Sequence, residues 1–410
     1  MKNFKKVFNL SLFSIHIYIS FLASFIGIIA ISIFYIHSVL NSQELLLAKF
    51  SLIFLIYFSI SLFSLIGNDQ EIIATSKNIK SKFINIDSKI FRILVSYFIV
   101  LILFYFIKYF KNIFIIDISD DDLIIIHIAL IFFIFNRIIQ AFCQASSKLI
   151  ENSTLDFARN VGYLVFVLLW LFELCKNISL IFVISELFVF ILIFFYFLFF
   201  NKKIKYQNKS LKFNKQYITI GLSQFSYQSI FKADIFTLAI FGNPILVVWF
   251  SVLSNVVEGI INFITTYHPA INNFIIKKKN RYKINKEKKN IKFIMAFCSV
   301  LILFITPAYI FFNILIFKEL PNIIFLVSII IINLSIFFFR NLFFYFNLYS
   351  MIKQPNKQFL FSIGIIISNI SLNMILFKFI GVLGIALAST LTMFIFYEII
   401  NKSLKKNKII

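Results

Sequence analysis

Apolar residues run through this chain in long stretches that lack the alternation of a β-strand. Each stretch is roughly 20 residues or longer, the length that a helix needs to cross about 30 Å of hydrocarbon. Backbone N–H and C=O groups must be satisfied inside a bilayer, and the stretches are too uniform for barrel strands, so we predict helices. Twelve spans are predicted, at residues 11–36, 45–66, 90–110, 123–145, 158–175, 178–200, 217–241, 245–268, 293–317, 322–350, 358–378 and 382–401.

The first span resembles the beginning of a signal sequence, because it follows Lys2, Lys5 and Lys6. It is longer than the apolar segment of a signal sequence and has no cleavage site of small residues. We therefore expect it to be retained as a helix. The pattern predicts an all-α, polytopic integral membrane protein with about twelve transmembrane helices.

The composition supports a membrane environment. Hydrophobic residues make up 60% of the chain and charged residues only 14%, against about 45–50% and about 25% in soluble domains. The 59 Phe and three Cys exclude a water-soluble enzyme, a disordered chain and a disulfide scaffold. A net charge of +23 raises the possibility of nucleic acid binding, but that needs a soluble basic face. We expect no nucleic acid partner.

The basic residues predict an orientation. With the N-terminus in the cytoplasm, 31 Lys and Arg fall in the inner loops and termini and five in the outer loops, with Arg159 counted in an inner loop. Cytoplasmic loops carry such an excess, so we predict that both termini are cytoplasmic. The charge therefore reflects topology and attraction to anionic lipid.

The segment 201–216 carries six Lys and divides the predicted spans into two sets of six. We predict an N-terminal six-helix lobe at 1–205 and a C-terminal six-helix lobe at 206–410, around a central cavity. The outer connection before the fourth span is acidic, and we expect it to be a solvated loop. Its carboxylates are Asp117, Asp120, Asp121 and Asp122.

Polar residues inside spans are costly unless they meet a partner or water, so they indicate candidate sites. The eighth span places a stripe on one helical face, with a central carboxyl group, Glu258. Interhelical hydrogen bonding is the simpler interpretation, but a six-member stripe favours a hydrated cavity. The stripe consists of Ser251, Ser254, Asn255, Glu258, Asn262 and Thr265.

Three other spans carry polar faces with a basic residue. Arg137 and Arg340 lie in the cytoplasmic halves of their helices, so snorkelling to the headgroups is an alternative to a binding role. Arg nevertheless has a planar fork of donors that suits phosphate. In the seventh span Lys232 and Asp234 are about 200° apart around the helix and do not pair with each other. The faces are Arg137, Gln140 and Gln144 in the fourth span, Gln224, Gln228 and Lys232 in the seventh, and Asn333, Arg340 and Asn347 in the tenth.

Catalytic and cofactor motifs are absent from the sequence. The four His lack the spacing of metal ligands, the three Cys form no C-x-x-C pair, and no P-loop is present. We expect no catalytic residues, no metal and no cofactor. Any transport must draw its energy from a gradient or from another protein.

Several segments resemble the bacterial polysaccharide repeat-unit flippases, the O-antigen and capsule transporters of the multidrug/oligosaccharidyl-lipid/polysaccharide export superfamily. They are SLIGNDQEIIATSKN after the second span, KADIFTLAIFGNPILVVWFSVLSNVVEGI in the seventh and eighth spans, and FIGVLGIALASTLTMFIFY in the last span. The resemblance implies two six-helix lobes around a cavity that opens alternately to each side. It also implies movement of a polyprenyl-diphosphate-linked sugar unit to the outer leaflet for surface polysaccharide or lipopolysaccharide synthesis.

The polar residues fit that task. Arg137, Arg340 and Lys232 would bind diphosphate, because such charges cannot cross hydrocarbon unaided. Asp234 and Glu258 are candidates for binding a coupling proton or cation. Amides would bind sugar: Gln140, Gln144, Gln224, Gln228, Asn255, Asn262, Asn333 and Asn347.

Two other functions remain open. A drug or metabolite exporter of the same superfamily has the same twelve-span plan. A membrane polysaccharide polymerase or ligase is the rival enzyme, but such enzymes carry a large outer loop with Arg and His, and the outer loops here are short. The partners expected are the lipid-linked oligosaccharide, the membrane and other polysaccharide assembly proteins.

Overall fold

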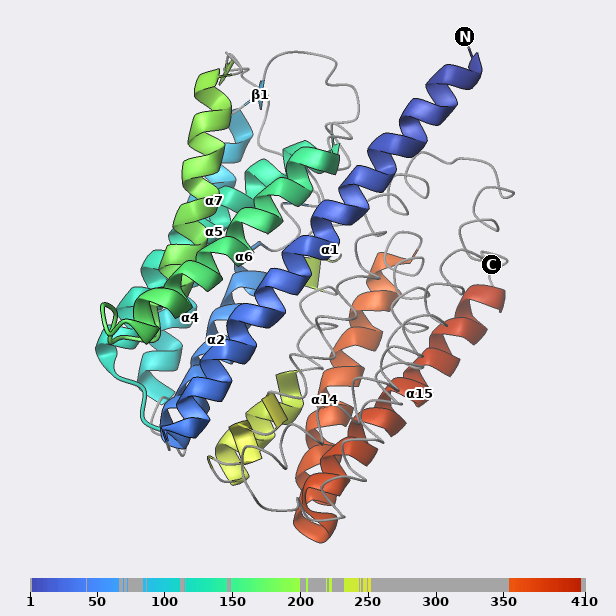
Figure 1. The fold of residues 1–410 in the computed structure, drawn as a ribbon. Coiled ribbons are helices and arrows are strands. Elements are labelled where there is room, and N and C mark those ends of the chain that lie inside the picture. Colours follow the sequence, from blue (N-terminus) through green and yellow to red (C-terminus); the bar gives the residue numbers. More distant parts are fainter. Residues whose placement is uncertain are drawn as a thin grey trace. The chain divides into compact units, whose positions relative to one another are not determined.

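The computed structural model of the chain is built from long helices (Figure 1). It describes residues 2–41, 43–65, 84–85, 87–110, 116–145, 149–199, 204–205, 232–242 and 354–406, with isolated positions at 69, 72, 114, 219, 221–222, 244, 246–248 and 250–251. The labelled helices are α1 (Lys2–Leu40), α2 (Glu44–Leu65), α4 (Asp87–Phe110), α5 (Asp120–Ala145), α6 (Leu149–Leu171), α7 (Leu180–Phe199), α14 (Pro355–Ile380) and α15 (Val382–Lys406). Residues 232–241 are also helical.

Two very short strands accompany the helices. β1 (Ile84–Asn85) and β2 (Ile204–Lys205) pair in parallel, with Ile84 opposite Ile204 and Asn85 opposite Lys205. Each strand has only two residues, so the pair links two loops and does not form a sheet on which the fold depends. The predicted all-α class is confirmed.

Five of the described helices are long and apolar enough to cross a membrane. They are Tyr18–Ser38, Asp120–Gln144, Ile150–Leu171, Asn356–Ile380 and Val382–Ser403, and shorter apolar helices occur at Leu45–Ser61, Ile93–Tyr109 and Leu180–Phe195. Large apolar side chains point outward from them, including Phe98, Tyr109 and Phe379. Such exposed apolar surface suits a lipid environment, so the chain is a polytopic membrane protein.

Most predicted spans match the described helices to within a few residues, but two begin nine residues too late. The first was predicted to begin at residue 11, but α1 begins at Lys2. The fifth was predicted to begin at residue 158, but α6 begins at Leu149. Its first turns carry polar residues that pair with one another and with neighbouring helices, so they do not need water. Arg159, which we assigned to a cytoplasmic loop, lies inside this helix. The spans predicted at 245–268, 293–317 and 322–350 lie outside the described residues, except for a few positions before 252.

We predicted that the acidic connection before α5 is a solvated loop, but one of its carboxylates, Asp122, is buried. Asp122 is only 1% exposed, and its Oδ2 accepts hydrogen bonds from the Ser119 backbone N–H at 3.1 Å and from the Ser119 hydroxyl at 2.5 Å. The Ser119 Oγ in turn accepts from the Asp122 N–H at 3.2 Å, as in a capping box. The Ser179 hydroxyl donates to the other oxygen of Asp122 at 2.8 Å. Asp122 therefore caps α5 and fixes the connection that precedes α7.

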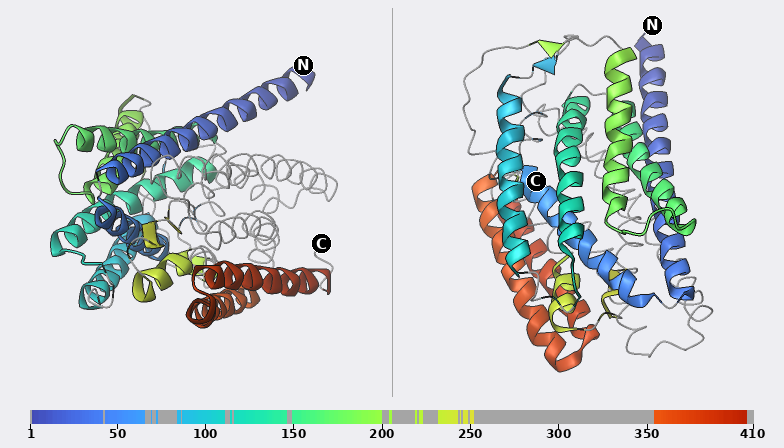
Figure 2. Two further views of the ribbon diagram at one scale, coloured as in Figure 1. Left: turned by 60° about the horizontal axis from the view of Figure 1, so that its bottom comes forward. Right: turned by 90° about the vertical axis from the view of Figure 1, so that its left-hand side faces the viewer.

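Two compact units make up the chain. Unit 1 contains residues Met1–Tyr35, Ile56–Ile113 and Asp117–Gly221, and unit 2 contains Ile36–Leu55, Phe114–Ile116 and Leu222–Ile410. Within unit 1, α7 packs against both α5 and α6, and α4 packs against α5 (Figure 1). Within unit 2, α14 and α15 lie side by side in all views (Figures 1 and 2).

The turn between α14 and α15 requires glycine. Gly381 has φ of 64°, a left-handed conformation that side chains with a Cβ rarely adopt. Its N–H donates to the Phe377 carbonyl at 2.8 Å, which closes the last turn of α14. Glycine at this position lets α15 begin one residue later and fold back along α14.

Helices α6 and α7 approach closely at Gly162, where a Cβ would lie within 3.2 Å of the Ser185 backbone. We expect Gly162→Val to destabilise the protein by about 1–3 kcal/mol or more, because the backbone of α7 cannot move aside as a flexible side chain can. Thermal unfolding of the purified protein in detergent measures this. Gly364→Ala on α14 is the control, because a Cβ there would meet only the Phe396 ring, at 3.6 Å. An unfolding temperature for Gly162→Val equal to that of Gly364→Ala would contradict the packing described.

Candidate functional site

Five of the predicted site residues lie within the described residues: Arg137, Gln140, Gln144, Lys232 and Asp234. The first three belong to unit 1 and the last two to unit 2. The other eight predicted site residues lie outside the described residues and stay predictions. They are Gln224, Gln228, Asn255, Glu258, Asn262, Asn333, Arg340 and Asn347.

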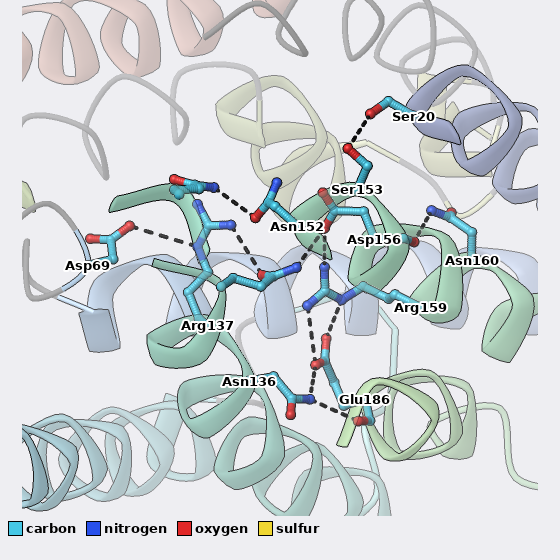
Figure 3. A network of polar contacts seen from close by, with 12 residues as sticks. Ser20, Asp69, Asn136, Arg137, Asn152, Ser153, Asp156, Arg159, Asn160 and Glu186 are labelled. Carbon is cyan, nitrogen blue, oxygen red and sulfur yellow. Dashed lines mark hydrogen bonds and ion pairs between the residues drawn. The ribbon is translucent and has the colours of Figure 1, made fainter. Parts of the chain in front are cut away.

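The predicted polar face of α5 meets a second polar face on α6 (Figure 3). The Gln140 amide donates to Asp156 Oδ1 at 2.8 Å, and the Gln144 amide donates to Asn152 Oδ1 at 3.1 Å. Gln140 is fully buried. These two bonds are spaced by one helical turn on each helix, so they hold α5 and α6 in register.

At the centre of this network lies an ion pair between α6 and α7. Arg159 Nε lies 2.7 Å from Glu186 Oε1, and Arg159 Nη2 lies 3.4 Å from Glu186 Oε2. The guanidinium also binds Asp156 through Nη1, at 3.1 Å from Oδ1. Figure 3 shows the Arg159 side chain between the two carboxylates. One cation thus neutralises part of two negative charges, in the forked geometry that favours Arg over Lys.

The Glu186 carboxylate accepts two further hydrogen bonds. Tyr57 donates its hydroxyl to Oε1 at 3.1 Å, and Asn136 donates its amide to Oε2 at 2.8 Å. The same amide also lies 2.8 Å from the Glu186 backbone carbonyl. The Glu186 side chain is 1% exposed. Its charge is therefore stabilised entirely by protein groups, which a buried carboxylate requires.

The network becomes more accessible toward Arg137 and Asp156. Their side chains are 32% and 40% exposed, whereas that of Asp69 is 5% exposed. Arg137 Nε lies 3.8 Å from Asp69 Oδ2, and Arg137 Nη1 donates to Gln140 Oε1 at 3.4 Å. A partly exposed guanidinium, a partly exposed carboxylate and amides therefore occur together in this part of unit 1.

A second polar cluster lies in unit 2 around Asp234. The Ser389 hydroxyl lies 2.6 and 2.7 Å from the two carboxylate oxygens of Asp234, so it donates to one of them at a time. The Asn373 amide donates to Oδ1 at 2.8 Å and the Asn369 amide at 3.4 Å. These partners come from α14 and α15. All of them are neutral, in contrast to the partners of Glu186.

Lys232 lies two residues before Asp234 and makes a different contact. Its Nζ lies 5.2 Å from the centre of the Phe54 ring, a cation–π distance. Lys232 is 2% exposed. The prediction that Lys232 and Asp234 do not pair with each other agrees with these contacts.

Sequence reasoning missed several members of both clusters. Glu186 was detectable, because it is the single charged residue within the apolar segment 178–200. Asn369 and Asn373 stand one turn apart in an apolar span, which is also a usable signal. Ser389 lies in the segment FIGVLGIALASTLTMFIFY, but it was not predicted as a site residue. In the part of the chain that the structure describes, no group of three His, Cys, Asp or Glu residues is placed to hold a metal ion.

The architecture is that of a polytopic helical membrane protein with polar clusters buried among its helices, and comparison with solved structures identifies the fold. Neither a protein-family model nor a curated protein matches the sequence. Among solved structures, the MATE multidrug transporter DinF-BH, solved in complex with rhodamine 6G, matches with a TM-score of 0.71 at 16% identity, over 97% of this chain and 96% of that one.

Two further matches belong to the MOP superfamily. One is a multidrug resistance MATE transporter in an outward-facing conformation, with a TM-score of 0.59 at 11% identity, covering 96% of this chain and 97% of that one. The other is a transporter from Pyrococcus furiosus, with a TM-score of 0.55 at 10% identity, covering 96% of both chains. The chain therefore has the fold of the MATE and other MOP superfamily transporters, along nearly its whole length.

Proposed function

We propose that the protein is a membrane transporter that moves a polyprenyl-diphosphate-linked oligosaccharide from the inner to the outer leaflet of a bacterial cytoplasmic membrane, for surface polysaccharide synthesis. The observation that carries this proposal is the polar network of unit 1. Among apolar helices it combines the partly exposed guanidinium of Arg137 with several amides. Diphosphate needs such cations, and sugar hydroxyls need such amides, because both lose water on entering a membrane protein.

The accessible end of the network is where substrate would bind. Arg137 is partly exposed and is held by Asp69 and Gln140 in an orientation that leaves donors of its fork for a ligand. Gln144 lies two turns further along the same face.

We also propose transport by alternating access, which the fold supports. The structural neighbours named above are transporters, which supports transport over the polymerase or ligase alternative. We propose that the lobes predicted at 1–205 and 206–410 open alternately to each side. Asp234, with its neutral oxygen and amide partners, is the proposed site of a coupling proton or cation, and Glu258 is a second candidate.

A drug exporter is the second candidate function, and a specific observation favours it. The best-scoring of the three neighbours above is a multidrug transporter that was solved with a rhodamine dye bound. In addition, the Asp156 carboxylate is 40% exposed and would suit a cationic compound. The two functions differ in the charge of the substrate, and therefore in whether Arg137 or Asp156 contacts it.

Arg137→Ala separates these candidates. We expect it to reduce surface polysaccharide strongly, because a diphosphate would lose a charge-assisted partner worth roughly 1.5–3 kcal/mol, and Arg137→Lys to restore it only in part. The measurement is gel analysis of cell-surface glycan in a host whose own copy of the gene is deleted, with equal membrane levels of each variant. Lys108→Ala, at an exposed ion pair with Asp120, is the control. Normal glycan in the Arg137→Ala strain, together with altered tolerance to cationic dyes, would favour the drug exporter.

The proposed topology has its own test. Arg159 does not belong to an inner loop, but the excess of basic residues in the remaining inner segments persists without it. Reporter fusions after residues 41, 118, 243 and 319 should therefore report an outer location, and fusions after 80, 208 and 284 a cytoplasmic one. Two or more reversed sites would contradict cytoplasmic termini.

A further inference from the structure

Glu186 and Asp234, two of the buried carboxylates among the described residues, are neutralised in different ways. Glu186 is 1% exposed and contacts a guanidinium through both of its oxygens. Asp234 is 7% exposed and contacts one hydroxyl and two amides, with no cationic side chain within ion-pair distance among the described residues. A carboxylate among apolar helices needs a proton, a bound cation or a tethered cation. In unit 1 a tethered cation, Arg159, neutralises the Glu186 carboxylate.

The groups around Arg159 form a set of oxygen ligands. Besides the Glu186 carboxylate they include Asp156 Oδ1, which lies 3.1 Å from the Arg159 Nη1, and the Tyr57 hydroxyl. The Asn136 side chain is fully buried, and its Oδ1 has no hydrogen-bond partner although the Nδ2 of the same amide contacts Glu186. Rotation of that amide by about 180° would exchange its two end atoms, so that the unpaired oxygen would face Glu186 where Nδ2 now lies. Carboxylate, amide and hydroxyl oxygens are the ligands that hard cations prefer.

We infer that Arg159 is a built-in counter-ion that occupies a latent alkali-cation site formed by Glu186, Asp156, Asn136 and Tyr57. While the guanidinium is present, each Glu186 oxygen accepts two hydrogen bonds, so neither carboxylate oxygen of Glu186 is available to a free ion. The native unit 1 therefore neither binds nor releases a cation at this place. Without the guanidinium, two carboxylates and two neutral oxygens remain around one vacated position, with a formal charge of −2.

The test uses the full-length protein in detergent and needs no transport assay, so its outcome is independent of the proposed function. Thermal unfolding is measured in NaCl and in N-methyl-D-glucamine chloride at equal ionic strength, for the wild type, Arg159→Gln, Arg159→Lys and Arg159→Gln/Glu186→Gln. We expect Na⁺ near 100 times its Kd to raise the unfolding temperature of Arg159→Gln by about 5 °C above any rise seen in the wild type. Arg159→Lys, which keeps a tethered cation, should show no such extra rise.

The double variant is the decisive control, because it removes the carboxylate that would bind Na⁺. The extra rise must disappear in Arg159→Gln/Glu186→Gln, while any contribution of Asp234 is the same in all variants.

Folded Arg159→Gln protein that responds to neither Na⁺ nor Li⁺ would overturn the inference. If Arg159→Gln yields no folded protein in any salt, recovery of folded protein on adding Glu186→Gln supports it, since a neutral pair needs no counter-ion. Failure of that double variant to fold would show instead that Arg159 acts through packing, and would also overturn it.

Discussion

Glu186→Ala is expected to lower the free energy of unfolding by about 3–5 kcal/mol, the largest loss for any single substitution considered. The change leaves Arg159, whose side chain is 17% exposed, with only the partly exposed Asp156 as a counter-charge. Removing one partner of a buried ion pair costs this much because the remaining charge stays desolvated. It also leaves the Tyr57 hydroxyl and the Asn136 amide without their shared acceptor.

Lys108→Ala provides the matched control for Glu186→Ala. The Lys108–Asp120 pair is also within ion-pair distance, at 3.3 Å, but its side chains are 48% and 50% exposed. Exposed pairs contribute about 0–1 kcal/mol, so this variant should unfold close to the wild-type temperature. Thermal unfolding followed by circular dichroism measures both. Equal losses for the two variants would mean that burial does not set the strength of the Glu186 pair.

Asp234→Asn is expected to reduce transport at least about tenfold and to abolish its dependence on a proton or Na⁺ gradient. The Asn side chain has nearly the shape of Asp and keeps contacts with Ser389 and Asn373, but it carries no charge to attract a cation. A charge-assisted interaction is worth roughly 1.5–3 kcal/mol, and each 1.4 kcal/mol is a factor of ten. The thermal stability should change little, because the wild-type partners are all neutral.

Vesicles with imposed proton or Na⁺ gradients measure this effect. Asp117→Asn is the control, because Asp117 is an exposed carboxylate in the connection before α5. Wild-type transport by Asp234→Asn, with an unchanged response to both gradients, would make the cluster around Asp234 a structural feature. In that case Glu258 would be the remaining candidate for coupling.

The helices were predictable from hydropathy because lipid selects long apolar segments, and this signal does not depend on contacts between helices. It failed at α6 for a physical reason. Asn152, Asp156, Arg159 and Asn160 make the first half of that helix polar by composition, yet their charges and amides are satisfied on α5, α6 and α7. An average hydropathy over a stretch of sequence includes the free energy of placing each polar group in lipid. It does not include the hydrogen bond or ion pair on another helix that offsets this free energy.

The same limit explains which site residues were predictable. Helical spacing places Arg137, Gln140 and Gln144 on one face, and in the structure Arg137 contacts Gln140, while Gln140 and Gln144 each bond to a residue of α6. Spacing within a helix does not determine which residue of another helix lies opposite, so the pairing of Arg159 with Glu186 could not be inferred. The partners of Asp234 lie between 135 and 155 residues away along the chain, so they could not be inferred from the sequence either.

The central claim is that the substrate is a lipid-linked oligosaccharide. The most direct measurement uses purified protein in proteoliposomes that contain a fluorescent polyprenyl-diphosphate-linked oligosaccharide in the inner leaflet, and it follows the arrival of sugar at the outer leaflet with a membrane-impermeant glycosidase. A parallel assay follows transport of a cationic rhodamine dye by the same vesicles. We expect protein-dependent flipping of the glycolipid that Arg137→Ala reduces, and no dye transport above that of empty vesicles. Dye transport without flipping of the glycolipid would contradict the claim.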